Sequence, residues 1–379
     1  MINFNKPHMT GRETEYIRQA VESGKISGNG EFTKRCQAFF EKRYGFRKCL
    51  LTTSCTDALE MAALLTGVGP GDEVIVPSYT FVSTALAFVR TGAKIVFCDS
   101  CADNPNVDPA EIEKLVTPQT KVIAPVHYAG VACDMDAIMD IAHRHGLLVV
   151  EDAAQAIDSF YVSAPRGKDA ASTVKKPLGS IGHLAAFSFH ETKNIVSGEG
   201  GMLVVNDERF IRRAEILWEK GTNRAEFFRG EVNKYGWVDI GSSFLPSEIV
   251  AAFLWAQLEN LEAIQDERKR IWNAYWTGLQ ARADRGDFAL PHIPDFATNN
   301  AHMFYLVFPD LAKRSSFIAG MKEKGIQCVF HYLSLHSSDF YAPRHDGRRL
   351  PNCDRFADCL VRLPLYYGLP VERVLAAFD

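Results

Sequence analysis

Residues 188–194 read Ser-Phe-His-Glu-Thr-Lys-Asn, and residues 197–202 read Ser-Gly-Glu-Gly-Gly-Met. The apolar run 184–188 predicts a strand that ends just before Lys193, and the glycines predict a turn into another strand. The strand fixes the backbone, and the glycines permit close approach of another group. Lys193 is therefore expected on a loop, positioned for chemistry.

An acid lies in a matching place upstream. Residues 147–155 read Leu-Leu-Val-Val-Glu-Asp-Ala-Ala-Gln, a buried type of strand that delivers Asp152 at its carboxyl end, where open α/β sheets bind ligands. A lysine that bonds an aldehyde and an acid that pairs with a pyridinium nitrogen are the two protein groups that pyridoxal phosphate needs. We therefore predict a pyridoxal-phosphate enzyme with Lys193 and Asp152 as its catalytic residues.

The rest of the chain predicts an α/β fold. Apolar runs alternate with helical patterns between residues 48 and 206, which favours a mainly parallel sheet covered on both faces, a three-layer sandwich. The expected strands are 48–52, 73–76, 94–97, 122–126, 147–151, 184–188 and 202–205. A helical pattern from Ser247 to about Arg282 is expected to bridge to a smaller α+β unit with strands at 303–308 and 327–332 and a helix at 315–324. The predicted domains are 1–250, which includes an N-terminal arm, and 251–379.

Composition limits the partners. The 379 residues are 47% hydrophobic and carry a net charge of −4 without a long basic run, so nucleic acid is not an expected partner. The start of the chain has no signal pattern and no apolar run approaches a membrane span, so we expect no membrane association and a cytoplasmic location. The nine cysteines are expected as reduced thiols, and Cys98 with Cys101 forms a lone pair, so no metal site is predicted.

Four patches together resemble one family. They are residues 53–60, 70–84, 151–155 and the lysine loop, and the likeness extends from Phe4 to about Leu369. The chain is similar to the DegT/DnrJ/EryC1/StrS sugar-nucleotide aminotransferases. The resemblance implies an aspartate-aminotransferase-like fold (fold type I), pyridoxal 5'-phosphate as cofactor, and a homodimer with shared active sites. It further implies transfer of an amino group from L-glutamate to C4 of a dTDP-4-keto-6-deoxyhexose for surface polysaccharide.

The resemblance also implies cofactor-binding residues. A phosphate needs backbone donors at a helix start and small hydroxyls around it, which residues 54–56 can provide. The family usually has Ser-Gly-Thr there, so Cys55 is a departure. Phe81 would stack on the cofactor ring, and Ser243 stands where the family has an asparagine that reaches the neighbouring subunit's cofactor. The expected cofactor-binding set is Ser54, Cys55, Thr56, Phe81, Asp152, Gln155, Ser188, Lys193 and Ser243.

Substrate contacts are expected on two segments. Residues 221–235 combine basic and aromatic residues on a predicted loop, and Arg224, Arg229 and Lys234 are candidates for the diphosphate across a subunit boundary. A solvated basic loop is the alternative. His331 and Tyr332 resemble the family's sugar-side wall, as does the segment 300–305.

Several alternatives stay open. The reaction could aminate C3 in place of C4, and a few relatives with histidine in place of the lysine are dehydratases. A cofactor-binding regulatory protein is a third possibility, although no DNA-reading helix is evident. Residues Tyr161–Lys176 form an insertion relative to the family, either a harmless surface loop or a cap on the cleft or neighbouring subunit. The glycine-rich stretch 24–30 is predicted to be a turn.

Overall fold

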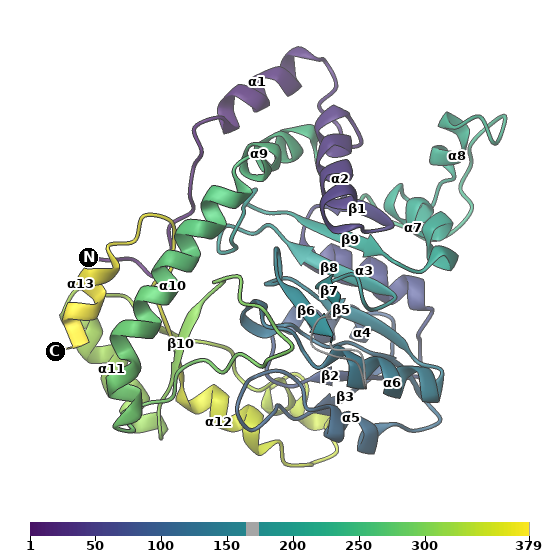
Figure 1. The fold of residues 1–379 in the computed structure, drawn as a ribbon. Helices are drawn as coiled ribbons and strands as arrows, with labels where there is room; N and C mark the ends of the chain where they lie inside the picture. Colours follow the sequence, from purple (N-terminus) through teal and green to yellow (C-terminus); the bar gives the residue numbers. More distant parts are fainter. Residues whose placement is uncertain (164–173, 379) are drawn as a thin grey trace.

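The computed structural model describes residues 1–163 and 174–378, and its centre is a seven-stranded sheet with the order β1-β9-β8-β5-β4-β2-β3 (Figure 1). Strand β9 runs antiparallel to both of its neighbours, and the remaining pairs are parallel. The prediction of a mainly parallel sheet is confirmed. The strands are β1 (Lys48–Thr52), β2 (Glu73–Pro77), β3 (Lys94–Cys98), β4 (Thr120–Ile123), β5 (Leu148–Asp152), β8 (Leu184–Ser188) and β9 (Gly201–Val205).

Helices cover both faces of this sheet. Along β5, Val149 packs with one buried cluster and Val150 with the other, which is why the strand reads as a continuous apolar run. One cluster contains residues of α2 (Glu31–Tyr44), α6 (Met135–His145) and α9 (Glu248–Leu258). The other contains residues of α3 (Cys55–Thr66), α4 (Val82–Val89) and α7 (Ile211–Trp218). Helix α5 (Pro109–Leu115) lies beside α6 (Figure 1).

Proline shortens one expected strand. The run 122–126 was expected to be entirely strand, but β4 ends at Ile123. Pro125 has no amide hydrogen to donate, so the ladder beyond it reduces to an isolated bridge between Val126 and Asp152. The carbonyl of Pro125 accepts a hydrogen bond from the Asp152 amide at 2.8 Å, which fixes the end of β5.

The predicted bridging helix is two helices. Helix α9 ends at Leu258 and α10 (Leu261–Asp284) begins three residues later. At the break, the Asn260 side chain donates to the Ala256 carbonyl at 2.9 Å and competes with the helical pattern. Helix α9 packs against α1 (Glu13–Glu22) and α2, whereas α10 runs on to the second sheet (Figure 1).

The second sheet has three antiparallel strands in the order β10-β12-β11. These are β10 (Phe304–Val307), β11 (Val329–Phe330) and β12 (Leu360–Leu363). Strand β11 is shorter than the predicted 327–332 because Tyr332 has a φ of 47°, in the left-handed region, which ends the strand. Around the sheet lie α10, α11 (Leu311–Glu323), α12 (Pro351–Cys359) and α13 (Val371–Leu375). Ile2 near the N-terminus pairs with Ile326, so the start of the chain reaches the second unit. The division into two domains at residue 250 stays a prediction.

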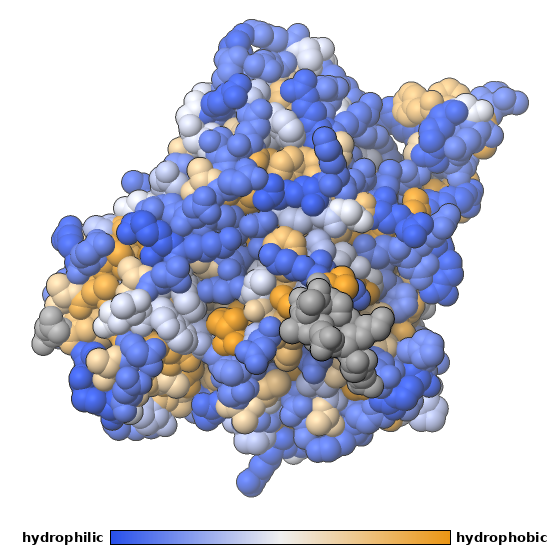
Figure 2. Space-filling model, viewed as in Figure 1, coloured by the Kyte–Doolittle hydropathy of each residue, from blue (hydrophilic) through white to orange (hydrophobic). Residues whose placement is uncertain are grey.

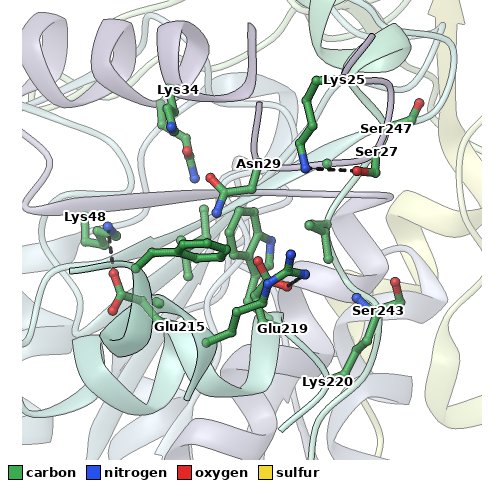
Figure 3. Close-up of a pocket in the computed structure, with 18 of the residues that line it drawn as sticks. Lys25, Ser27, Asn29, Lys34, Lys48, Glu215, Glu219, Lys220, Ser243 and Ser247 are labelled. Carbon is green, nitrogen blue, oxygen red and sulfur yellow. Dashed lines mark hydrogen bonds and ion pairs between the residues drawn. The ribbon is translucent and has the colours of Figure 1, made fainter. Parts of the chain in front are cut away.

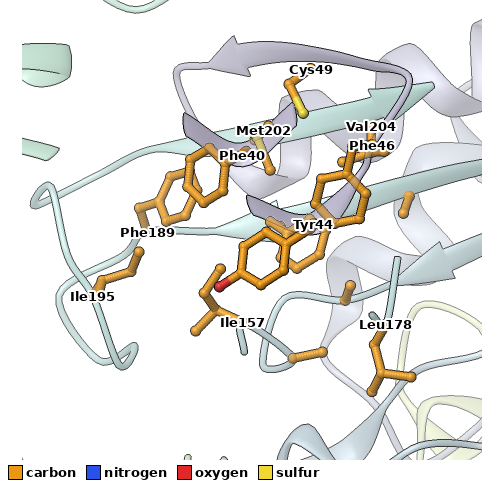
Figure 4. Close-up of a cluster of buried hydrophobic side chains, with 14 of the residues drawn as sticks. Phe40, Tyr44, Phe46, Cys49, Ile157, Leu178, Phe189, Ile195, Met202 and Val204 are labelled. Atoms are coloured by element: carbon orange, nitrogen blue, oxygen red, sulfur yellow. The ribbon is translucent and has the colours of Figure 1, made fainter. Parts of the chain in front are cut away.

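The lysine loop is anchored in the large core. Phe189 is 1% exposed and stacks on Phe40 with ring centroids 5.5 Å apart, and Ile195 is fully buried. Figure 4 shows both side chains pointing into one cluster with Tyr44 and Met202. Buried side chains therefore hold the loop on both sides of Lys193.

The insertion lies mostly outside the described residues. Its flanks are strands, since β6 (Phe160–Ser163) pairs antiparallel with β7 (Val174–Pro177). The predicted surface loop at 164–173 between them falls on residues that the structure does not describe. Among the helices of the described part, none is both long enough and apolar enough to span a lipid bilayer.

Candidate active site

A cavity of about 770 Å³ opens at the carboxyl ends of β5 and β8. It brings together eleven of the residues singled out in the sequence. The predicted residues that line it are Ser54, Cys55, Thr56, Phe81, Asp152, Gln155, Ser188, Lys193, His331 and Tyr332, with His302 from the expected sugar-side segment.

Lys193 enters this cavity from the lysine loop. Its amide donates to the His190 carbonyl at 2.9 Å, and its side chain is half-buried, with the exposed part facing the cavity. Burial lowers the pKa of Lys193, while Cys55 and Asp152 act in the opposite direction. A lowered pKa enriches the neutral amine, the form that can act as nucleophile and base.

Asp152 is the last residue of β5 and is 5% exposed. Its Oδ2 accepts from Thr84 Oγ1 at 2.7 Å, and its Oδ1 accepts from the Ala154 amide at 3.1 Å. Thr84 Oγ1 lies 3.0 Å from Thr80 Oγ1, so a short hydroxyl chain orients the carboxylate. Burial raises the pKa of Asp152, and a cation at its cavity side would favour the ionised form. The carboxylate is thus set up to pair with a cationic ring nitrogen.

Glu151 supports the strand from the other face. It is fully buried and accepts from the amides of Gly179 and Ile181, both at 2.8 Å, and from that of Gly182. Its Oε2 lies 2.9 Å from His127 Nε2. Burial by itself raises the pKa of Glu151, but the His127 contact and the backbone donors outweigh it and lower the pKa. The end of β5 is therefore held by charge-assisted hydrogen bonds on one face while Asp152 faces the cavity.

The start of α3 fits a phosphate. Ser54 caps the helix, accepting from the Asp57 amide at 3.1 Å, which leaves the amides of the first turn at the cavity. A Cβ on Gly201 would lie 2.4 Å from the Cys55 nitrogen, so only glycine lets β9 pass this close to the cup. Cys55 stands in the first helical turn with a negative φ, so the departure from glycine costs no strain there.

Hydroxyls surround that cup. Thr56 Oγ1 lies 2.7 Å from Ser83 Oγ, and Ser188 ends β8 on the same cavity wall. Small hydroxyls next to free amides are the donor set that a phosphate monoester needs. The residues present fit the phosphate, the ring nitrogen and the aldehyde of pyridoxal phosphate.

The opposite wall is aromatic. Tyr332 stacks on His331 with centroids 3.5 Å apart, and its hydroxyl accepts from Gln155 Nε2 at 3.1 Å. Gln155 Oε1 accepts from the Ala129 amide at 2.6 Å, so both ends of this amide are already engaged within the chain. The Phe81 ring is 56% exposed at the mouth of the cavity, 6.1 Å from Tyr332.

Three further residues of this cavity or its support were absent from the predicted set. Thr84 orients Asp152 and lies at the end of the patch 70–84, one helical turn after Thr80, a spacing that could have indicated it. Asn194 Oδ1 lies 2.8 Å from His302 Nδ1 and ties the lysine loop to the second unit. Arg362 comes from β12 and lines the cavity. The feature of the sequence that could have indicated it is a single arginine inside the apolar run 360–365.

The structure separates the other predicted residues from Lys193. Ser243, Arg224 and Arg229 line a second cavity of about 720 Å³ together with the glycine-rich turn 24–30 (Figure 3). Lys234 is exposed and lines neither of these two cavities. The segment 221–235 was expected to be a loop, but residues Arg224–Phe228 form helix α8. That part of the prediction is wrong, because the Phe227 and Arg229 amides find helical acceptors at Asn223 and Ala225.

Two cations of the second cavity, Arg229 and Lys48, share Glu215 as an acidic partner. Arg229 contacts Glu215 at 2.9 Å and Glu231 at 2.7 Å. Lys48 contacts Glu215 at 3.0 Å, the pair marked in Figure 3. Helix α8 projects from the body of the molecule (Figure 1), and hydrophobic atoms gather at its tip (Figure 2). The exposed fractions are 67% for Phe228 on α8 and 84% for Trp237 in the segment that follows it.

Metal ligation has no support in the described ranges. Within 1–163 and 174–378, no group of three or more His, Cys, Asp or Glu side chains is arranged to hold an ion. Cys101 donates to the Val107 carbonyl at 3.6 Å, and Cys98 is buried in a core cluster.

Comparison with known proteins decides the family. A sequence profile of the DegT/DnrJ/EryC1/StrS aminotransferase family matches residues 7–378. The chain belongs to this family. It is 32% identical over 382 residues to the spore coat polysaccharide biosynthesis protein SpsC of Bacillus subtilis, a match that covers 98% of this chain and 94% of SpsC. It is also 32% identical over 389 residues to the GDP-perosamine synthase of Caulobacter vibrioides, with 100% and 97% covered.

Solved structures agree with this assignment to the aminotransferases. Spr1654 of Streptococcus pneumoniae in its PMP form is 25% identical, with a TM-score of 0.88 over 100% of this chain and 98% of that one. Its PLP form gives a TM-score of 0.86 over 99% and 97%. The predicted family, fold class and cofactor are confirmed. This chain is a pyridoxal-phosphate-dependent sugar aminotransferase.

Proposed function

We propose that this aminotransferase moves an amino group from L-glutamate to C4 of a dTDP-4-keto-6-deoxyhexose, giving a dTDP-4-amino-4,6-dideoxyhexose for surface polysaccharide. The observation that carries the proposal is the placement of Lys193 and Asp152. Lys193 follows β8 and Asp152 ends β5, and these two strands are parallel neighbours. Both residues line one cavity, in which the start of α3 suits a phosphate. The four patches of family resemblance support the sugar and the donor.

The roles of the residues follow from their surroundings. Bound pyridoxal phosphate would supply an aldehyde that bonds the transferred nitrogen and a ring that accepts the electron pair of the neighbouring C–H bond. Lys193 Nζ takes up the proton from the donor carbon and in the second half reaction returns one to C4 of the sugar. Asp152, held by Thr84 and the Ala154 amide, keeps a positive charge at the ring nitrogen. The first turn of α3 binds the phosphate.

The test of the substrate is product analysis. The enzyme is incubated with L-glutamate and dTDP-4-keto-6-deoxyglucose, or with the GDP-linked hexose, and the products are compared by NMR. Amination at C4 of the dTDP sugar is expected. The name of one relative, GDP-perosamine synthase, makes the GDP sugar the sharpest competitor. Faster turnover of the GDP sugar, or amination at C3, would contradict the proposal.

A dehydratase is the second candidate in the same assay. It would remove a hydroxyl from the keto-sugar and incorporate no nitrogen. Relatives of that kind have histidine in place of the lysine, whereas Lys193 is present here and half-buried at the cavity. Transfer of ¹⁵N from glutamate to the sugar distinguishes the two reactions.

We further propose a homodimer with shared active sites, located in the cytoplasm. Ser243, Arg224 and Arg229 line a cavity apart from Lys193, so they would meet a cofactor or diphosphate only across a subunit boundary. The exposed aromatic residues of α8 and the segment after it supply apolar area for such an interface. All nine cysteines are free thiols, which suits a reducing compartment.

A further inference from the structure

His302 is a buried histidine between the lysine loop and the second unit. It lines the Lys193 cavity. Its Nδ1 lies 2.8 Å from Oδ1 of Asn194, the residue that follows Lys193 in the chain. The ring therefore lies beside the residue that carries the reacting amine.

A backbone carbonyl fixes the orientation of the Asn194 amide. Its Nδ2 donates to the Asn300 carbonyl at 2.9 Å and to Gln265 Oε1 at 2.8 Å. Because a carbonyl can only accept, the group that faces Asn300 must be the NH₂ group, and Oδ1 is left to face His302. Oδ1 can also only accept, so His302 Nδ1 carries a hydrogen and donates it to Asn194.

The neutral ring of His302 then has its lone pair on Nε2. Burial lowers the pKa of His302 well below its ordinary value, and the cations Lys193, Arg268 and Arg362 lower it further, which keeps the ring neutral. Among the described residues none donates a hydrogen bond to Nε2, and the protein does not cover this atom completely. Nε2 is thus a hydrogen-bond acceptor that is open to the cavity.

An acceptor beside the reacting amine needs a ligand that can donate. Two other acceptors that line the cavity are engaged, since Asp152 accepts from Thr84 and a backbone amide, and Gln155 Oε1 accepts from a backbone amide. In an α-amino acid such as glutamate, the groups next to the reacting carbon are a carboxylate and a methylene, and neither can donate. A sugar carries a hydroxyl on a carbon next to its carbonyl, so the sugar is the substrate that fits Nε2.

We propose that His302 accepts a hydrogen bond from the sugar hydroxyl on the carbon next to the carbonyl, and that Asn194 fixes the ring tautomer that this bond requires. The inference rests on the proposed function in that C4 is aminated. The hydroxyl is then the one on C3, because C5 carries the methyl group and the ring oxygen. His302 determines specificity, since a sugar without this hydroxyl leaves Nε2 without a donor.

The test compares the two half reactions of the enzyme loaded with pyridoxal phosphate, followed by stopped-flow absorbance of the cofactor. Its ligands are the amino donor that wild type accepts and the amino sugar that wild type makes. His302→Asn keeps an N–H group in the place of Nδ1 for Asn194 but removes the Nε2 acceptor. The second-order rate constant with the amino sugar should fall about 10- to 100-fold, the scale of one unsatisfied polar group, and that with the amino donor should stay within about threefold.

The choice of ligand separates this inference from the proposed function. If C4 is not the aminated carbon, the structure of the amino sugar shows it, and the half reactions are still compared with the sugar that the enzyme makes. His143→Asn is the matched control, because it makes the same change at an exposed residue of α6. It should leave both half reactions unchanged.

Removing the hydroxyl tests the contact from the side of the sugar. An amino sugar nucleotide that is deoxygenated on the carbon next to the amine should react with wild type about 10- to 100-fold more slowly. With His302→Asn, loss of the hydroxyl should change the rate constant by less than about threefold, because both changes remove the same hydrogen bond.

Nitrogen NMR gives a readout apart from turnover. In protein labelled with ¹⁵N-histidine, the signals of His302 are assigned by their loss in His302→Asn. They should show a protonated Nδ1 and an unprotonated Nε2 in wild type. Asn194→Ala removes the acceptor of the Nδ1 hydrogen, so a measurable fraction of the ring should carry its hydrogen on Nε2, with a lower rate constant for the amino sugar.

Three results would overturn the inference. Equal losses in both half reactions of His302→Asn would assign Nε2 to the Lys193 amine or make His302 a structural residue. A hydrogen on Nε2 in wild type would make that atom a donor. An undiminished rate of wild type with the deoxygenated sugar would exclude the contact, and this measurement needs no variant that must fold.

Discussion

The two cavities of this aminotransferase differ in where their charged groups come from and in how those groups are paired. In the Lys193 cavity the catalytic groups come from strand ends and a loop packed into the core, and two cations, Lys193 and Arg362, face the space without a salt bridge to a described residue. In the second cavity Arg229 and Lys48 already pair with Glu215. The first cavity holds the groups for chemistry, whereas the second lies beside a projecting helix and is lined by more cations than acids: Lys25, Lys34, Lys48, Lys220, Arg224 and Arg229 against Glu215 and Glu219.

The first cavity is suited to proton transfer and the second to binding of a ligand. Desolvation acts on the groups of the first cavity, since burial raises the pKa of Asp152 and lowers that of Lys193. In the second cavity, ion pairs with Glu231 and Glu215 raise the pKa of Arg229, although partial burial opposes them, so it stays a fixed charge. A permanent charge on a long side chain suits binding of a diphosphate. Groups whose pKa values are shifted by their surroundings suit proton transfer.

The largest expected effect tests which cavity carries the chemistry. Lys193→Ala should lower turnover by about 10⁴-fold or more, because the same amine is lost as covalent attachment point and as proton carrier. Borohydride reduction followed by peptide mapping should find the cofactor on Lys193 in wild type and on no lysine in the variant. Lys114→Ala, an exposed residue of α5, is the control and should be fully active. Cofactor found on Lys48 or Lys220 would reverse the roles of the two cavities.

The next effect concerns the acid. Asp152→Asn should lower turnover by about 10²–10³-fold, the scale of removing one preoriented electrostatic contact, with part of the cofactor affinity kept. Thr84→Val removes a 2.7 Å hydrogen bond to the carboxylate but not its charge, and about a tenfold loss is expected. Steady-state kinetics and cofactor titration measure both. Near-normal turnover of Asp152→Asn would mean that the ring nitrogen needs no negative partner here.

Stability should differ between the supports of the two cavities. Phe189→Ala removes a ring that is 1% exposed next to Lys193, and about 3–5 kcal/mol of unfolding free energy should be lost. Phe228→Ala on α8 removes a ring that is 67% exposed, and a change within about 0.5 kcal/mol is expected for the single chain. Denaturant unfolding measures both. Equal losses at low protein concentration would show that α8 is part of the core.

The sequence predicted the first cavity better than the second for a physical reason. Lys193 and Asp152 are placed by strands whose apolar runs are local signals, and the parallel pairing of those strands brings their carboxyl ends together. Arg362 was missed because its strand has only four residues and its partners on β10 and β11 lie more than 30 residues away in sequence. Its contact with the cavity depends on packing between two units, which no local pattern encodes.

The second cavity shows where local patterns mislead. Arg224 and Arg229 were expected on a loop as candidates for the diphosphate, but the amides after Asn223 close a helical turn and Arg229 pairs with Glu215. Likewise, the pattern from 247 to 282 is helical throughout, and only the side-chain bond of Asn260 breaks it. In both cases the deciding hydrogen bonds join residues four positions apart, Arg229 to Ala225 and Asn260 to Ala256.

The last prediction asks whether the two cavities meet between subunits. Lys193→Ala protein and Arg229→Ala protein are each expected to be inactive or strongly impaired, and they are mixed under conditions that exchange subunits. If Arg229 serves the partner's Lys193 cavity, both lesions of a mixed dimer fall in one site and the other site is intact. Each mixed dimer then regains about half of the wild-type activity.

A matched pair makes this result interpretable. Lys193→Ala mixed with Asp152→Asn combines two lesions that line the same cavity of one chain, so neither site of a mixed dimer is whole and no activity should return. Exchange is verified in both mixtures by mass spectrometry of differently tagged subunits. Recovery with Arg229→Ala but not with Asp152→Asn assigns the second cavity to the neighbouring active site. No recovery in either mixture, despite exchange, would confine Arg229 to its own chain and leave the α8 surface without a role in catalysis.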